Sequence, residues 1–113
     1  MNTTTAVSFS ALLSALLNNQ EVPEGPSLVD EEGELPCTLS SIECLVEKLP
    51  QILTNLGCNR QNVELRPDGD CQQFSVSASG RTPDSAHQFV VSLNAALHST
   101  GQSTLLYCVR VLA

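Results

Sequence analysis

Residues 63–78 read VELRPDGDCQQFSVSA, and this stretch decides the fold class. Its first four residues alternate between apolar and polar side chains, as a strand does, and Phe74, Val76 and Ala78 alternate with polar residues near its end. Between the two runs, the sequence PDGD over 67–70 combines the residue types that form a type I turn. The stretch therefore predicts a β-hairpin whose second strand has one buried and one polar face.

A helix is predicted immediately before this hairpin, over residues 39–56. Its apolar positions recur at helical spacing and are Leu39, Ile42, Leu45, Val46, Leu49, Leu53 and Leu56. Ser40 followed by Glu43 has the spacing of a capping box, and Gly57 is a typical residue for the end of a helix. Pro50 lacks an N–H group, so we expect it to kink or split the helix close to residues 48–49.

A second helix and a last strand are predicted after the hairpin. The sequence TPD at 82–84 suits the start of a helix, and Gly101 suits its end. The helical stripe between them consists of Ala86, Phe89, Val90, Leu93, Ala96 and Leu97. Residues 104–112 then carry apolar side chains on both faces, which is typical of a strand inside a sheet or covered on both sides.

The order helix, hairpin, helix, strand predicts an α+β fold. Its last three elements form a β-α-β unit, whose strands should be parallel and whose crossover should be right-handed. We therefore expect a two-layer sandwich, with helices on one face of a three-stranded mixed sheet. The second apolar face of the last strand, at Leu106, Cys108 and Leu112, finds no partner in so small a domain. It predicts a further contact, with the leading segment or with a second subunit.

The negative charge is concentrated at the start of the chain. The 113 residues carry a formal net charge of −7, from five basic and twelve acidic residues. Residues 1–36 hold six of the acids and no Lys or Arg, which gives −6. Because residues 19–36 also contain Pro and Gly, they are predicted to be an acidic linker between a helical arm, 1–18, and an α+β domain, 37–113. This charge disfavours nucleic acids and anionic membranes as partners, and no apolar run is long enough to span a bilayer.

The arm is predicted to form a short amphipathic helix. Its apolar stripe is Phe9, Leu12, Leu13, Leu16 and Leu17. So short a helix is marginal in water and needs a surface to pack against, either in its own chain or on another protein. The sequence LSALL at 13–17 also resembles the LxxLL motif with which coactivators dock on nuclear receptors, a pattern that many amphipathic helices share. If the stripe binds a partner, Leu16→Asp abolishes association and leaves the domain from Cys37 onward folded.

The cysteines and histidines are the candidate residues for chemistry. The five cysteines include no CxxC pair, and their odd number predicts reduced thiols in the cytoplasm or the nucleus. Cys58 and Cys71 flank the first strand of the hairpin, which leaves a disulfide or a two-thiol edge of a metal site open. A cysteine nucleophile paired with His87 or His98, placed about three turns apart on the second predicted helix, also stays open. No P-loop, GxGxxG or GxSxG motif is present, and we predict no catalytic residue, metal or cofactor.

These observations favour a non-enzymatic protein-binding or assembly subunit, an adaptor or scaffold whose partner is another protein or a second copy. The predicted contact residues are Phe9, Leu12, Leu13, Leu16, Leu17, Leu106 and Leu112. Arg60, Arg66 and Arg81 are predicted to form one basic cluster near the ends of the hairpin, where an acidic segment would dock. The alternative is a small metal or redox protein, or an enzyme, that uses the thiols.

Overall fold

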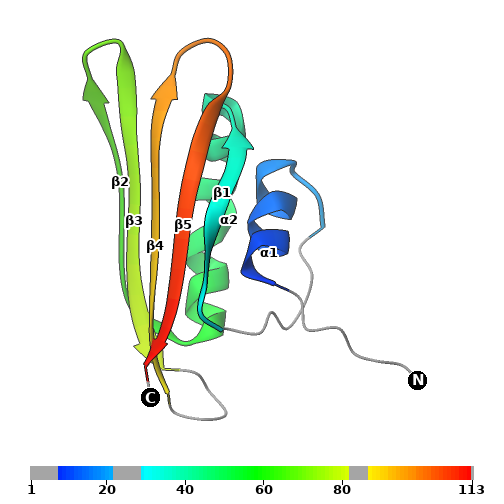
Figure 1. The fold of residues 1–113 in the computed structure, drawn as a ribbon, viewed down its shortest axis with the longest axis vertical. Helices are drawn as coiled ribbons and strands as arrows, with labels where there is room; N and C mark the ends of the chain where they lie inside the picture. Colours follow the sequence, from blue (N-terminus) through cyan, green and yellow to red (C-terminus); the bar gives the residue numbers. More distant parts are fainter. Residues whose placement is uncertain (1–7, 22–28, 82–86, 113) are drawn as a thin grey trace.

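The computed structural model describes residues 8–21, 29–81 and 87–112. Within these ranges, seven elements follow one another (Figure 1). They are α1 (Phe9–Leu17), β1 (Glu31–Cys37), α2 (Leu39–Leu56), β2 (Cys58–Asp68), β3 (Cys71–Arg81), β4 (Gln88–His98) and β5 (Ser103–Leu112).

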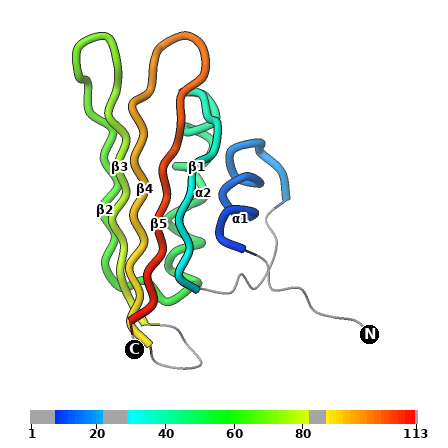
Figure 2. Tube along the Cα trace, in the orientation of Figure 1, coloured from blue at the N-terminus to red at the C-terminus, as the bar shows by residue number. Residues whose placement is uncertain are grey.

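The five strands form one antiparallel sheet in the order β1-β5-β4-β3-β2. In Figures 1 and 2, α2 lies behind this sheet and α1 lies beside α2, next to β1. The predicted α+β class is confirmed. The predicted three-stranded mixed sheet is wrong, because the sheet has two more strands and every neighbouring pair is antiparallel.

The element that overturns the predicted topology is β4, which replaces the second predicted helix. Phe89, Leu93 and Leu97 are spaced by four residues, a spacing that fits one face of a helix and also one face of a strand. The structure buries Val91 and Ala95 between them and exposes Val90, so the period is two. The β-branched pair at 90–91 favours the strand as well.

The described residues therefore contain no β-α-β crossover. β3 and β4 pair antiparallel over their whole length, from Cys71 opposite His98 to Arg81 opposite Gln88. The predicted helix start at 82–84 lies outside the described residues. The prediction that the last strand is interior to the sheet is confirmed, since β5 lies between β1 and β4.

The predicted hairpin is confirmed as β2 and β3. Val63 pairs with Val76 and Leu65 pairs with Phe74, so the apolar residues of both strands share one face. The turn is centred one residue later than predicted, at Gly69 and Asp70, because Asp68 still pairs with Cys71. Gly69 has φ 64°, a left-handed conformation that glycine adopts without the penalty of a side chain.

The helix predicted over 39–56 is confirmed as α2, although its start is capped by other residues. The Thr38 hydroxyl accepts a hydrogen bond from Ser41 N at 3.2 Å, and Thr38 N donates to Ser41 Oγ at 2.7 Å. This capping box replaces the one predicted from Ser40 and Glu43. The helix ends at Gly57 as predicted, and it continues through Pro50 without being split.

The acidic stretch before α2 contains a strand. Glu31 to Cys37 form β1, which pairs with β5 from Glu31 opposite Val109 to Cys37 opposite Ser103. The linker prediction is therefore wrong for this part of 19–36, while residues 22–28 lie outside the described residues. The acidic composition does not exclude a strand at this position, because an edge strand forms backbone hydrogen bonds with its neighbour whatever the polarity of its side chains.

The core lies between the helices and one face of the sheet. It includes the α1 stripe, four α2 residues and the inward residues of β3, β4 and β5. The largest fully buried side chains are Phe9, Phe74, Phe89, Leu12, Leu13, Leu16, Ile42, Leu45, Leu49, Leu53, Leu93 and Leu97. None of the described helices is long and apolar enough to cross a membrane.

Glu31 connects α1 to the sheet. Its carboxylate accepts hydrogen bonds from Phe9 N at 3.0 Å and Ser10 N at 3.2 Å, and Tyr107 Oη donates to it at 3.4 Å. The hydroxyl of the N-cap residue Ser8 accepts a further hydrogen bond from Ala11 N at 3.2 Å. A carboxylate at this end of a helix satisfies N–H groups that have no partner within the helix and interacts favourably with the helix dipole.

Replacement of Glu31 by Gln is expected to lower the free energy of unfolding by about 0.5–1 kcal/mol, because the charge that faces the start of α1 is lost. The measurement is urea-induced unfolding. Glu34→Gln, an exposed position on the same strand, is the matched control and should change stability little. Equal effects of the two substitutions would show that Glu31 does not anchor α1.

Candidate functional site

The leucine stripe of α1 lies inside the protein. Phe9, Leu12, Leu13, Leu16 and Leu17 are all buried in the core that α1 shares with α2 and the sheet. Docking within the chain, one of the two alternatives for this helix, is what the structure contains. The LSALL segment consequently offers no leucine face to a receptor groove in this conformation.

The opposite face of the sheet, which we call the open face, is not covered by any described segment. Leu106 is 51% exposed and Leu112 is 47% exposed, and both point away from the helices because they alternate with buried Leu105 and Val109. Leu106 borders two shallow hollows of about 460 and 560 Å³. The two leucines lie on the face of the last strand that the sequence left without a partner. Polar side chains such as Ser77 occupy the middle of the same open face.

The three predicted docking arginines do not form one cluster. Arg60 and Arg81 line the same hollow of about 270 Å³ at one end of the sheet. Arg66 lies six residues further along β2, roughly 20 Å away, and forms an ion pair with Glu64 at 3.5 Å. Arg110 lies at the same end of the sheet as Arg60, because Arg60 pairs with Ser79. Ser79 in turn pairs with Val90, and Val90 pairs with Arg110. The sequence missed this because sheet order decides which arginines are neighbours.

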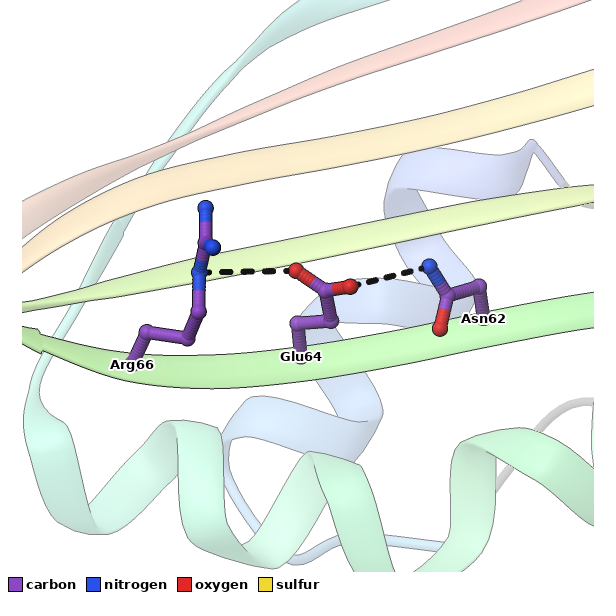
Figure 3. A network of polar contacts seen from close by, with 3 residues as sticks. All are labelled: Asn62, Glu64 and Arg66. Carbon is purple, nitrogen blue, oxygen red and sulfur yellow. Dashed lines mark hydrogen bonds and ion pairs between the residues drawn. The ribbon is translucent and has the colours of Figure 1, made fainter.

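The outer edge of β2 is a second candidate surface. β2 pairs with β3 on one side, and no described strand pairs with its other side. Its side chains on the open face are, in order, Arg60, Asn62, Glu64, Arg66 and Asp68. Figure 3 shows the middle three, where Glu64 accepts a hydrogen bond from Asn62 at 3.2 Å and pairs with Arg66. Both signs of charge therefore occur along one edge strand.

The other edge of the sheet, β1, has a different character. Its open-face residues Glu32 and Glu34 are both exposed and acidic, and Pro36 follows them. Arg110, which pairs with Glu32 at 3.4 Å, belongs to β5 and not to the edge itself. Two copies of β1 brought side by side would place carboxylates near carboxylates, so this edge is unsuited to self-pairing.

The five cysteines are free thiols. Cys58 and Cys71 lie at opposite ends of the hairpin, opposite Gly80 and Asp68 respectively, so the disulfide left open by the sequence does not form. Burial raises the pKa of the Cys58 thiol to about 11 and also raises the pKa of Cys37. A thiol with a raised pKa is less often a thiolate, and these two positions are therefore poor nucleophiles.

Cys71 has an imidazole neighbour. Its Sγ lies 3.2 Å from Nδ1 of His98, which is its direct partner across the β3–β4 ladder. The prediction that His98 lies on a helix is wrong, because β4 occupies that segment. His98 N also donates to Ser103 Oγ at 3.2 Å, which holds the end of β4 against the start of β5. His87 precedes β4 and lies at the other end of that strand.

Within the described ranges, no group of three or more His, Cys, Asp or Glu side chains has the arrangement of a metal site. Comparison of the chain with family models, with curated proteins and with solved structures finds no match.

Proposed function

We propose that the protein is a non-enzymatic assembly subunit that pairs with a second copy of itself along the outer edge of β2. The observation that carries this proposal is the order of charges on that edge, Arg60, Asn62, Glu64, Arg66 and Asp68, with Asp70 in the turn that follows. Most closed dimers have a two-fold axis, so the same patch must complement itself. A strand with both signs of charge can meet this condition.

The backbone of β2 supports such a contact. An edge strand directs the N–H and C=O groups of alternate residues away from its only neighbour, and these groups are available to another strand. Two β2 strands related by a two-fold axis run antiparallel to each other. Their pairing would join two five-stranded sheets into one continuous sheet.

Charge selects the register of this pairing. With the two-fold axis at Leu65, Glu64 lies opposite Arg66 of the second copy, and Asn62 lies opposite its Asp68. Arg60 then lies next to the turn that carries Asp70 of the second copy, and no two like charges lie opposite each other. With the axis at Val63 instead, Arg60 would lie opposite Arg66, which is repulsive.

Leu65 is the second argument for this register. It belongs to the face that packs on the core, yet it is 40% exposed because β2 is the last strand on its side. At the two-fold axis it would meet Leu65 of the second copy and lose that exposure. Pro67 lacks an N–H group and would lie opposite Val63, where the carbonyl of Pro67 still accepts a hydrogen bond.

The open face would continue from one copy to the other. Leu106 and Leu112 lie on β5, two strands away from β2, and would remain exposed in the dimer. Docking of a further protein at these two leucines and at Arg81 stays a prediction, and the edge dimer would present two such surfaces in one assembly.

The test is the mass of the full chain in solution, measured by light scattering over a range of concentrations. We expect a dimer that Leu65→Glu converts to a monomer, since two carboxylates would meet at the axis. Leu106→Glu is the matched control, because Leu106 is equally large and at least as exposed but lies on the open face. A monomeric wild-type chain overturns the proposal, and so does a dimer that is lost only in Leu106→Glu.

A charge exchange tests the register. Glu64→Arg alone should weaken the dimer about tenfold or more, because two arginines then face each other at two symmetric positions. The double variant Glu64→Arg/Arg66→Glu should restore most of the affinity, since each pair is again of opposite sign. Failure of the second substitution to restore dimerisation would contradict the axis at Leu65.

A further inference from the structure

A thiol and an imidazole meet at the end of the sheet where the two tight turns lie. Cys71 is the first residue of β3 and His98 is the last residue of β4, so the turn beyond Asp68 and the turn beyond His98 flank them. The contact joins Sγ of Cys71 to Nδ1 of His98 at 3.2 Å. Cys71 is half-buried and His98 is exposed, so reagents in solution can reach both.

We propose that Cys71 is a reactive thiol, activated by His98, that exchanges with disulfides of low molecular mass. Two groups at this distance, one a nucleophile and the other a base, form the arrangement that activates cysteine in many unrelated proteins. Cys71 and His98 belong to β3 and β4 and not to β2, so their reactivity is tested separately from the proposed dimer, although Asp68 of β2 borders Cys71 and Leu106 borders the hollow beside His98.

The exchange uses only atoms that the site and the disulfide supply. His98 Nδ1 takes the proton of the Cys71 thiol, and the thiolate sulfur attacks one sulfur of the disulfide. The bond between the two sulfurs of the reagent breaks as the new bond to Cys71 forms. The departing thiolate then receives the proton, either from the imidazolium or from water, and a mixed disulfide remains on Cys71.

The charges around the pair define which disulfides it accepts. Asp68 lies opposite Cys71 on β2, Asp70 precedes it in the turn, and Glu34 borders the same hollow as His98. The nearest cation along β2 is Arg66, which already pairs with Glu64. These carboxylates repel anions. We therefore expect neutral or cationic disulfides to react faster than anionic ones.

The neighbouring hollow gives room for a small reagent. It is lined on the open face by Gln73 and Asn94, whose amides can hydrogen-bond to a ligand, and by His98 itself. Gln73 Nε2 also donates to Asp68 at 3.2 Å, so one carboxylate near the thiol is held in place.

The experiment measures the rate at which the folded, full-length protein reacts with the neutral reagent 4,4′-dithiodipyridine between pH 5 and 9. Mass spectrometry locates the modified cysteine. We expect one fast phase that modifies Cys71 and is lost in Cys71→Ser. Cys108→Ser is the matched control, because Cys108 is a half-buried thiol of the same face that lies opposite Ser92 on β4, and it should keep the fast phase.

The role of His98 is tested by the shape of the pH profile. His98→Asn places an amide near the position of Nδ1 without a titratable group, and it should slow the fast phase about tenfold at pH 7. The two rates should converge near pH 9, where an ordinary thiol ionises unaided. A fast phase at another cysteine, or equal rates for His98→Asn and wild type at every pH, would overturn the proposal. Thermal unfolding of each variant shows whether it is folded.

Discussion

Gly80→Ala is expected to lower the free energy of unfolding by about 3–4 kcal/mol, a large part of the stability of a small domain. A Cβ atom at this position would lie 2.1 Å from Gly57 O and 2.7 Å from Cys58 Cα. Both neighbours are backbone atoms and cannot rotate away as the end of a side chain can. The collision would therefore force apart the chain between α2 and β2 and the end of β3 that pairs with it.

The measurement is chemical denaturation of Gly80→Ala beside Gly101→Ala. Gly101 has φ 85° and no atom near the place of its Cβ, so alanine there is strained by its backbone conformation alone. We expect Gly101→Ala to lower the free energy of unfolding by about 1 kcal/mol. If Gly80→Ala were no more destabilising than the control, the close approach of β3 to Gly57 would not exist in solution.

Leu16→Asp is expected to destabilise the whole described domain by about 4 kcal/mol. Leu16 is 1% exposed, in the core that α1 shares with α2. The substitution removes a buried apolar side chain and forces either the burial of a carboxylate or the detachment of α1. This differs from the expectation based on the sequence, in which the same change disrupts association and leaves the domain intact.

Urea-induced unfolding and amide hydrogen exchange in β1 and α2 measure this effect. Ala11→Asp is the matched control, since it introduces the same charge at an exposed position of the same helix. It should leave the midpoint of unfolding nearly unchanged. Full stability of Leu16→Asp, together with loss of association, would instead show that α1 packs on another molecule.

Much of the fold could be predicted because local signals agree with the final structure. The hairpin at Val63 to Ala78, the helix α2 and its end at Gly57 follow from alternation, helical spacing and glycine. β4 could not be predicted in this way, because Phe89, Leu93 and Leu97 satisfy both periods. β1 could not either, because its residues gain order only from the backbone of β5, which follows some seventy residues later.

Some features of the candidate sites could likewise be predicted from the sequence, and others could not. The exposure of Leu106 and Leu112 was anticipated, because a strand that is apolar on both faces must place one face away from the core. The pairing of Cys71 with His98 was not, because a helix was predicted where β4 supplies the partner. The predicted cluster of Arg60, Arg66 and Arg81 is wrong, because β2 places Arg60 and Arg66 toward different ends of the sheet.

The sequence by itself determined the α+β class, the hairpin, the long helix and the apolar stripe of α1, because each depends on contacts and periodicities within about twenty residues. Only the tertiary structure decided the number and direction of the strands, the burial of α1 in its own chain and the two surfaces proposed for function. Strand pairing joins residues far apart in the chain, so side chains become neighbours through a register that local pattern does not encode. The charges of β2 are visible in the sequence, but that they lie along an unpaired edge is a property of the sheet.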